Sequence, residues 1–567
     1  MIIQELDKYY KRLLLDEGSD ISPLGFSSEK ISFAIVIDKE GRMLRINDLR
    51  EIQNKKKFPK QVVTPEAVKR TSGVSPNFMW DNSGYVLGVD SKGNAFKKFE
   101  AFRDYHHIVG GQTEDEGFQA VLKFLDSWVP EMSPDNPFIT EEVLGTNLVF
   151  QLETDLKYVH ERPEVKQIWL SYYNENSSFI KAQCLVCGDI KPLAQLHPPI
   201  KSVRGAQTSG AQIVSFNLSA FCSYKKEQSL NAPVSEESAF AYTTALNHLL
   251  RNESRQRIQI GDATTVFWTE RESPVEDMFG NLWDSRDTGE EDNKKIKDFL
   301  EAVRDGKNLP GVDKDIGFFI LGLSPNAARI SIRFWMSSTV GKILDNMSLH
   351  FNDLRIEKRF DKDPDFPSVW MILKETATLG KTENISPLLS GHMMRSIISG
   401  SAYPESLLSA VITRIRAGGD INYVRASIIK GFLLRKKRFG DKNIMEVGMS
   451  LDQNSKSVAY RLGRLFAVLE KAQKDAVPGA NSTIRDRYFG AASATPGAVF
   501  PQLVRLAQHH IQKSDYGFNI DKMIEEIMSE IDSFPAHLKL SQQGEFSIGY
   551  YHQRQAFFKK STETTEA

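Results

Sequence analysis

Two cysteines near the middle of the chain have the spacing of half a zinc knuckle. Cys184 and Cys187 are separated by two residues and followed by glycine. A closed structural zinc site needs four ligands. His197 and Cys222 would complete this one, although their spacing fits no standard zinc ribbon. The alternative is a pair of ordinary thiols beside a strand turn. The spacing favours the second interpretation, so we expect neither a metal nor another cofactor.

The closest approach to a nucleotide-binding loop is the sequence WMSSTVGKIL. Gly341 and Lys342 follow an expected strand, but the first glycine of a phosphate loop is missing. Ile343 stands where a Ser or Thr must hold Mg²⁺. The chain also contains no dinucleotide fingerprint, HExxH or GxSxG motif. None of the motifs considered therefore supports a catalytic site; a nuclease or deaminase with an unrecognised site stays open as an alternative.

Two pairs of adjacent histidines, His106-His107 and His509-His510, are the remaining candidates for metal chemistry. Neither pair lies near the acidic cluster that a two-metal nuclease centre requires. Adjacent residues on a helix point in different directions, so the two members of a pair cannot bind one metal ion together. We interpret these histidines as partly buried surface residues.

A Gly- and Ser-rich stretch, GAQTSGAQIVSFN (205–217), carries polar groups suited to single-stranded RNA. Its flexible glycines expose backbone N–H groups, and its amide and hydroxyl side chains can bond to phosphate oxygens and splayed bases. A tight turn whose polar groups satisfy one another is the alternative. The candidate RNA-contacting residues are Gln207, Ser209, Gln212, Ser215 and Asn217.

Two further groups of cations could contact RNA or a nucleic-acid backbone. Arg329 and Arg333 stand four residues apart in an expected strand and should share a face, although salt-bridged arginines would look the same. A basic helix end would either grip a nucleic-acid backbone or complement the negative end of its own macrodipole. The residues of this second group are Arg425, Arg435, Lys436, Lys437 and Arg438.

The stretch RTSGVSPNFMWDNSGYVLG, residues 70–88, is too broken for a helix and too polar for a buried strand. It is either an elaborate turn or a surface that touches a ligand. Pro76 stiffens it. We expect Phe78 and Trp80 to anchor it in the core rather than to wedge into DNA, because aromatic side chains usually bury their large area.

The elements that must position these residues change in type near residue 340. The sequence predicts an α+β N-terminal part with mixed or antiparallel sheets, followed by an all-α C-terminal helical bundle. A Ser-Pro-Asn turn is expected within the last pair of strands. Strands are expected within 31–38, 43–50, 85–90, 145–190, 264–270 and 317–336, and helices within 3–14, 101–128 and 235–252.

At 567 residues the chain is long enough for several domains. We assign residues 1–340 to an α+β region that can subdivide near 130–145. Residues 341–448 form a helical connecting region, and residues 449–567 form a C-terminal helical bundle.

Charge is balanced overall but not locally. The chain has 72 Lys+Arg against 73 Asp+Glu, which argues against a histone-like polycation. From Lys39 to Arg70 there are ten basic and four acidic residues, and from Arg395 to Arg438 nine and two. These blocks are either local polyanion contacts or solvated faces that acidic residues balance in the fold.

Cysteine use and hydropathy bound the location of the protein. Only three cysteines are present, the N-terminus carries charges throughout, and no run of about eighteen apolar residues occurs. The sequence therefore predicts a soluble, cytoplasmic protein with no membrane contact.

Several blocks, taken together and in order, resemble the large subunit of the type I-C CRISPR interference complex (Cascade). The resemblance runs from the N-terminal helix almost to the end of the chain. The blocks are SGVSPNFMWDNSGYVLG, GAQIVSFNLSAFCSY with NAPVSEESAFAYTTALNHLL, FILGLSPNAARISIRFW, YRLGRLFAVLEKAQ, TIRDRYFGAASATPGAVFPQLVRLAQHH and GYYHQRQAFF.

The resemblance implies a non-enzymatic protein in an RNA-guided complex. Such a subunit contacts the 5′ handle of the CRISPR RNA, recognises the protospacer-adjacent motif of duplex DNA, helps to open the duplex and form the R-loop, and docks the helicase–nuclease. The implied partners are the CRISPR RNA, the target double-stranded DNA, the backbone and handle-binding Cascade subunits, a small subunit and the helicase–nuclease. A purely structural bridge, with DNA recognition by partner subunits, is the alternative.

In this family the N-terminal part faces the adjacent motif, which favours the contact interpretation of the stretch 70–88. Its asparagine amides can donate and accept at base edges, its Ser-Gly pair allows close backbone approach, and a basic pair can hold phosphates. The candidate DNA-contacting residues are Lys69, Arg70, Ser72, Gly73, Asn77 and Asn82.

The helical C-terminal part resembles a small subunit fused to the large one. Systems of this type can also make that part separately, from an internal translation start in the same reading frame. Met449 is the first candidate for this start and Met445 the second. The product would line the complex and hold the displaced strand or the heteroduplex backbone through basic side chains.

Overall fold

The structure is a computed structural model that separates into two compact units. The first unit comprises Met1–Lys201 and Ser209–His248, and the second comprises Ser202–Thr208 and Leu249–Ala567. The boundaries assigned from the sequence at residues 340 and 448 therefore both fall inside the second unit. The described residues are 1–16, 19, 21–53, 56–68, 70, 73–89, 95–175, 180–216, 218–283, 290–479 and 481–558.

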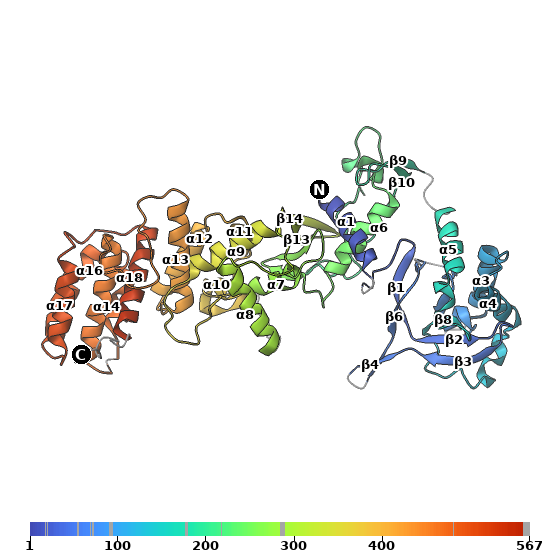
Figure 1. Ribbon diagram of the computed structural model, residues 1–567, viewed down its shortest axis with the longest axis horizontal. Helices are drawn as coiled ribbons and strands as arrows, with labels where there is room; N and C mark the ends of the chain where they lie inside the picture. Colours follow the sequence, from blue (N-terminus) through green and yellow to red (C-terminus); the bar gives the residue numbers. More distant parts are fainter. Residues whose placement is uncertain are drawn as a thin grey trace. The chain divides into compact units, whose positions relative to one another are not determined.

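A mixed four-stranded sheet forms the centre of the first unit (Figure 1). Strand β2 (Phe33–Ile37) pairs in parallel with β8 (Asn147–Leu152) and antiparallel with β3 (Met43–Asp48). Strand β7 (Trp80–Asn82) pairs antiparallel with the other side of β8. Every residue of β2 is buried, as expected of a β-branched run in the interior of a sheet.

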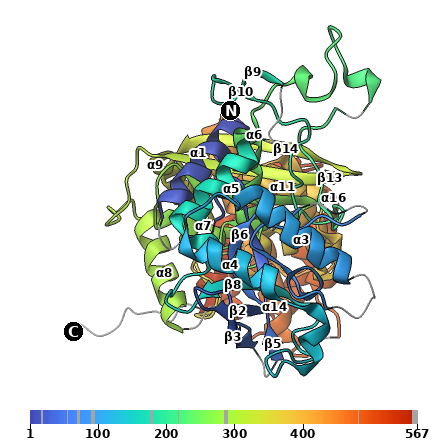
Figure 2. The same cartoon turned by 90° about the vertical axis from the view of Figure 1, so that its right-hand side faces the viewer.

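Three helices pack around this sheet and close its core (Figure 2). They are α3 (Ala95–Gly110), α4 (Glu116–Ser127) and α5 (Pro163–Glu175). Helix α4 begins at Asp115, whose carboxylate accepts a hydrogen bond from the Phe118 N–H at 2.8 Å, a standard N-cap. The core between the helices and the sheet is rich in aromatic side chains, including Phe78, Phe99, Phe102, Phe118, Phe124 and Phe150.

Shorter elements complete the first unit. Strand β1 (Phe26–Ile31) pairs antiparallel with β6 (Lys60–Pro65), and a narrow ribbon of β4 (Glu51–Gln53) and β5 (Lys56–Phe58) precedes β6 in the chain. The remaining elements are α1 (Ile2–Leu15), α2 (Ser83–Val86), η1 (Pro130–Asp135), η2 (Val159–Glu161), β9 (Lys181–Gln183), β10 (Ile190–Pro192), η3 (Ser219–Phe221), η4 (Gln228–Asn231) and α6 (Glu236–Leu249).

Two expectations for the first unit were wrong. The strand expected at 85–90 is helix α2 in part, because the Asn82 side chain accepts a hydrogen bond from the Gly84 N–H at 3.1 Å and caps a helical turn. The strands expected throughout 145–190 are interrupted by helix α5. It begins at Pro163 and buries Val165 and Trp169, which are four residues apart and therefore lie on one helical face.

An antiparallel four-stranded sheet opens the second unit, with strands in chain order. They are β11 (Arg257–Ile260), β12 (Ala263–Thr269), β13 (Gly317–Asn326) and β14 (Arg329–Thr339). The turn between the last two strands lies at 327–328, not at Ser-Pro-Asn, because Pro325 still pairs with Ile330. Ala327 adopts a left-handed backbone conformation (φ 53°) to close that turn.

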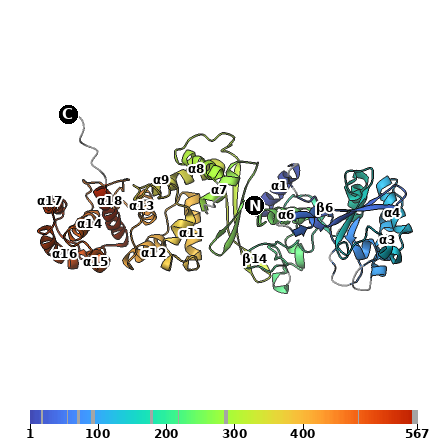
Figure 3. The ribbon, with the colours of Figure 1, turned by 90° about the horizontal axis from the view of Figure 1, so that it is seen from below.

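Beyond this sheet the second unit is helical (Figure 3). Its sheet and helices share one apolar core, which extends from Ile258 to Tyr551. The predicted fold class, α+β followed by a helical C-terminal part, is therefore confirmed. The helices are α7 (Val275–Trp283), α8 (Glu290–Arg304), α9 (Val340–Leu354), α10 (Val369–Lys374), α11 (Pro387–Ser399), α12 (Glu405–Arg416), α13 (Tyr423–Arg438), α14 (Val458–Ala476), α15 (Ile484–Ala492), α16 (Pro496–Ile511), α17 (Gly517–Met528) and α18 (Leu540–Phe558).

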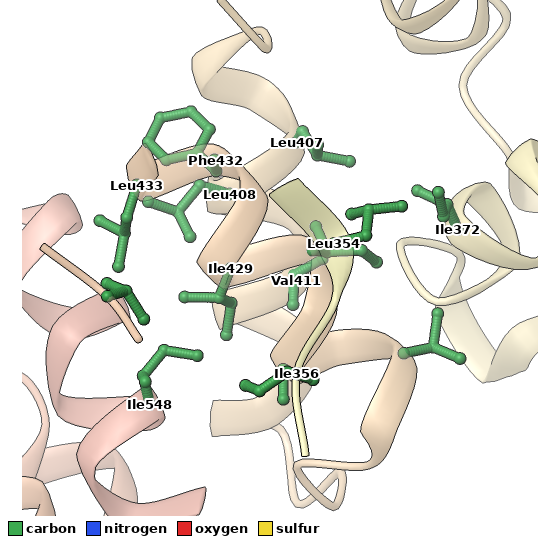
Figure 4. Close-up of a cluster of buried hydrophobic side chains, with 14 of the residues drawn as sticks. Leu354, Ile356, Ile372, Leu407, Leu408, Val411, Ile429, Phe432, Leu433 and Ile548 are labelled. Atoms are coloured by element: carbon green, nitrogen blue, oxygen red, sulfur yellow. The ribbon is translucent and has the colours of Figure 1, made fainter. Parts of the chain in front are cut away.

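Helices α14 and α18 cross very closely within this core. A Cβ atom added at Gly463 would lie 1.9 Å from the Phe546 carbonyl oxygen, and one at Gly549 would lie 2.0 Å from that of Tyr460. Only glycine permits this approach. Helix α18 also packs on α13, where Figure 4 shows Ile548 beside Ile429. The helices after residue 449 are thus continuous with the core of the helices before it.

Candidate nucleic-acid interface

The loop at 73–82 is held in place by an ion pair at its two ends. The Arg70 guanidinium pairs with the Asp81 carboxylate and donates to the Ser75 carbonyl at 2.6 Å. The guanidinium carbon of Arg70 also lies 4.2 Å from the centroid of the Tyr85 ring. Burial raises the pKa of Asp81 against the opposing effect of Arg70. Arg70, a predicted phosphate contact, therefore stabilises the loop itself.

Both candidate asparagines also serve the loop. The buried Asn77 accepts a hydrogen bond from the Val68 N–H at 2.9 Å, and its own N–H donates to Asp81 at 2.9 Å. Asn82 is half-buried and caps α2. Both asparagines, predicted as DNA contacts, therefore hold the turn. Base contact by either residue stays a prediction.

The aromatic residues of the loop lie in the core, as expected. Phe78 and Trp80 are both buried, and the Trp80 indole N–H donates to the Pro65 carbonyl at 2.8 Å. Between them, the Met79 N–H donates to His106 Nε2 at 2.8 Å. His106 Nδ1 lies 2.7 Å from the Phe102 carbonyl and must donate to it, so the ring is neutral. Burial lowers the pKa of His106 to about 4.

What the loop leaves exposed is a short stretch of backbone. Gly73 has a left-handed conformation (φ 86°), and among the described residues, its chain neighbours apart, none has an atom within 4 Å of the position its Cβ would take. Val74 beside it is 43% exposed. Lys69 and Ser72, two further predicted contacts, lie outside the described residues. The loop is thus a fixed base that presents the backbone at Gly73 and Val74.

The β4–β5 ribbon presents cations that sequence reasoning did not single out. Lys57 pairs with Asp48 at 2.9 Å, and Arg50 pairs with the same carboxylate at 2.8 Å. These hydrogen bonds, from Arg50 first, lower the pKa of Asp48. Lys56 and Lys60 are exposed and form no ion pair with a described residue. The run of lysines at 55–57 is the sequence signal that could have found them.

The predicted RNA-contacting stretch is irregular rather than strand-like. Gln207 and Ser209 are exposed, whereas Gln212 and Ser215 are half-buried. The Gln212 amide donates to the His197 carbonyl at 2.7 Å. Gln207 belongs to the second unit and the other three to the first. Asn217 lies outside the described residues.

The segment that follows projects an aromatic side chain that the sequence analysis missed. Residues 218–228 are exposed throughout, and Tyr224 is 94% exposed with a φ of 53°. Asn231 holds the segment in shape. Its side chain accepts from the Ser223 N–H and donates to the carbonyls of Lys226 and Gln228, each at 2.9 Å. An exposed ring on a fixed turn, followed by two lysines, is suited to stacking on a base.

The arginines of β14 do not share a face in the simple way their spacing predicts. The pairing with β13 shifts between Gly322 and Leu323, so Arg333 has no partner in the strand register. Such a bulge interrupts the alternation of side chains along the strand. Arg333 is exposed and pairs with Asp262 at 2.8 Å. The salt-bridged alternative therefore describes Arg333.

The basic end of α13 is paired with acids of the same unit. Arg435 is fully buried, donates to Asp353 at 2.8 Å, and lies 4.2 Å over the Tyr403 ring. Burial excludes Arg435 from strand contact in this conformation. The other four cations also have carboxylate partners: Arg438 with Asp353 at 2.7 Å, Arg425 with Glu375 at 2.7 Å, Lys437 with Glu446 at 3.1 Å, and Lys436 with Glu405.

Cys184 and Cys187 have the spacing of half a zinc knuckle, but in the fold Cys184 has other hydrogen-bond partners. Cys184 is buried and accepts hydrogen bonds from the N–H groups of Val186 at 3.3 Å and Ser235 at 3.2 Å. Burial opposes ionisation, but these bonds outweigh it and lower the pKa of Cys184 to about 7. His197 bonds to the Tyr242 hydroxyl at 2.7 Å instead. No group of three His, Cys, Asp or Glu in the described part of the chain could hold a metal ion.

Comparison with known proteins gives one family. The family model of the CRISPR-associated protein Cas_Csd1 matches residues 6–558, nearly the whole chain. No match is found among curated proteins. Within the described residues, no helix has both the length and the apolar character that crossing a membrane requires.

Proposed function

The chain belongs to the Cas_Csd1 family of CRISPR-associated proteins, the large-subunit family of type I-C Cascade, and on that premise we propose that it recognises the protospacer-adjacent motif through the loop at 73–82. In RNA-guided complexes base pairing reads the sequence, while protein reads the short adjacent motif and the backbone. The observation that carries the proposal is the fixed loop that exposes the backbone at Gly73.

The geometry suits close approach to a base pair. A side chain at position 73 would stand between the backbone and a groove, and glycine removes it. The Arg70–Asp81 ion pair and the Asn77 hydrogen bond order the loop before DNA arrives, so binding loses less conformational entropy. Asn77 and Asn82 then contribute to recognition by holding the loop in its conformation. This assigns the base contact to the Gly73 and Val74 backbone.

Phosphate contacts belong to exposed cations of the same unit. We assign them to Lys56 of the β4–β5 ribbon and Lys60 at the start of β6, because both are exposed and neither forms an ion pair with a described residue. Such contacts position the protein on the duplex without reading its sequence. They would also help to hold the duplex open while the R-loop forms.

The CRISPR RNA handle is assigned to the exposed polar segment of the first unit. Ser209, Ser215 and Tyr224 offer hydroxyl groups and a stacking ring, which suit unpaired bases. The proposed partners are the CRISPR RNA, the target duplex, the backbone and handle-binding subunits, a small subunit and the helicase–nuclease. The protein itself is proposed to be non-catalytic. Divalent-metal-dependent cleavage of DNA by the purified chain alone would contradict this.

Two glycine substitutions test motif recognition. Gly73 and Gly188 both lie in the first unit, have φ values of 86° and 84°, and have open space around the Cβ position. Either change to alanine costs about 1 kcal/mol of backbone strain. We expect only Gly73→Ala to reduce the preference of the assembled complex for one adjacent motif over all others. Equal preference in both variants would favour the structural bridge, with DNA recognition by partner subunits.

The internal translation start stays a proposal of its own. Met445 donates its backbone N–H to the buried Glu545 at 3.2 Å, and the Met449 carbonyl accepts from the Glu357 N–H at 2.9 Å. A product that begins at Met445 keeps the residue that contacts Glu545, whereas one that begins at Met449 loses it. Mass spectrometry of the expressed protein tests this, and the absence of fragments beginning at either methionine would contradict it.

A further inference from the structure

A cavity of about 600 Å³ opens in the first unit beside the fixed loop. Val74, Ser75 and Pro76 of the loop form part of its wall, and the rest comes from α3, α5 and α6, from Glu66 and Val68, and from the segment 194–198. Of its lining, the proposed recognition of DNA and RNA uses only the Val74 backbone. A space of this size accommodates a few residues of an extended peptide.

Aromatic side chains from α3, α5 and α6 line the cavity. Trp169 is fixed by its indole N–H, which donates to the Gly25 carbonyl at 2.6 Å. The Tyr172 ring lies 6.2 Å from that of Trp169 and meets the Tyr105 ring edge-on at 5.6 Å, and the Tyr173 ring lies 5.9 Å from Trp169. Contacting rings of this kind form the boxes that receive organic cations.

The charges in the cavity wall are of one sign. Among the described residues that line it, Glu66 and Glu236 are acidic and none is Lys or Arg. The Tyr173 hydroxyl donates to Glu66. Burial, and then the charges of Glu66 and Glu236, raise the pKa of Tyr173, as expected where the local potential is negative. Phosphate groups would be repelled here, and a cation would be attracted.

We propose that this cavity binds an arginine side chain presented by an extended segment of a partner protein. A guanidinium group stacks on aromatic rings and pairs with carboxylates through its planar fork, which a lysine ammonium cannot do. Leu196 at the cavity wall is 74% exposed and offers apolar contact to the residues that flank the arginine. The site therefore adds a protein-binding surface to the unit proposed to read DNA, and it does not depend on that proposal.

A matched pair of peptides tests the proposal on the full-length chain. The probe is a capped pentapeptide, Gly-Leu-Arg-Leu-Gly, and its control carries citrulline, which keeps the shape of arginine without the charge. Titration calorimetry should show the citrulline peptide binding about tenfold more weakly or worse. Equal binding of the two peptides, or no heat from the arginine peptide at about millimolar concentration, would overturn the proposal.

Variants then place the binding in the cavity. The double change Glu66→Gln and Glu236→Gln keeps hydrogen-bonding atoms but removes both charges, so it should weaken the arginine peptide about tenfold. Glu237→Gln is the control, because Glu237 is exposed, pairs with Lys191 and does not line the cavity. Thermal melting checks that all variants fold. An equal loss in the control, or an unchanged affinity in the double variant, would overturn the assignment.

Discussion

The basic end of α13 and the β4–β5 ribbon look alike in sequence but differ in the folded protein. Both carry runs of Lys and Arg, at 435–438 and 55–57. In α13 each cation of the run meets a carboxylate, and Arg435 is buried on Asp353, 82 residues away. In the ribbon, Lys57 is paired, whereas Lys56 forms no ion pair within the described part of the chain. A run of charges therefore indicates a contact surface only where distant acids do not already balance it.

The largest expected effect comes from breaking the buried pair. Arg435→Ala removes the buried partner of Asp353, leaves it only the pair with Arg438, and takes a donor from the carbonyls of Ser396 and Ser401. It should lower the free energy of unfolding by about 3–5 kcal/mol. Lys437→Ala is the control, because its exposed pair with Glu446 should contribute less than about 1 kcal/mol. Urea denaturation measures both. Similar losses would mean that the end of α13 is not divided into buried and exposed cations.

The free energy of unfolding should depend on pH, because the buried His106 of α3 holds the loop through the Met79 N–H. His106 has a pKa of about 4, below the value near 6.5 expected in the unfolded chain. In the unfolded chain His106 therefore binds a proton that it does not bind in the folded protein, and stability falls as pH drops from about 6.5 toward 4. The loss should approach about 3 kcal/mol. His106→Gln can keep both hydrogen bonds, so its unfolding should be less pH-dependent by that amount. Identical pH profiles would contradict the neutral buried ring.

A smaller effect is expected from the exposed lysines Lys56 and Lys60. Lys56→Ala with Lys60→Ala should leave stability unchanged and weaken binding of the complex to target DNA about tenfold. The slope of log affinity against log salt should fall by about two, one unit for each lost phosphate contact. Lys436→Ala with Lys437→Ala in α13 is the matched control and should leave the slope unchanged. A larger change in that control would reverse the assignment of the two regions.

The smallest expected effect concerns Asn82. Removing this helix cap in Asn82→Ala should cost about 1 kcal/mol of stability, which thermal melting measures. The preference of the complex for one adjacent motif should change little, because Asn82 affects it only by holding the loop in shape. A complete loss of motif preference with no loss of stability would restore Asn82 as a base contact and remove it from the structural residues.

Sequence periodicity was sufficient for the fold class but not for its irregular points. The buried run of β2 and the helical spacing after residue 340 identified their elements because burial follows those periods. Helix α2 was missed because it depends on the Asn82 cap, a local hydrogen bond without a periodic signal. The bulge at Arg333 was missed because a shift of strand register has no periodic signal. It lies beside Gly322, where a Cβ would lie 2.3 Å from the Phe334 ring.

The candidate site shows the same limit. Burial of Phe78 and Trp80 followed from residue type alone. The commitment of Asn77 to the Val68 N–H, and of Arg435 to Asp353, depends on partners that only the fold brings near. Amide and guanidinium groups that look available for nucleic acid in a sequence are also the groups that best satisfy buried backbone and carboxylates. Spacing in the sequence does not distinguish the two uses.

The most direct measurement is a photo-crosslink from the loop to DNA. Benzoylphenylalanine at Val74, beside Gly73, would be compared with the same group at Leu156, which is 99% exposed in the same unit. In the assembled complex bound to its target, the loop should crosslink to the duplex at or next to the adjacent motif, and the control should not. Crosslinks from Val74 only to protein or CRISPR RNA would contradict motif recognition by this loop.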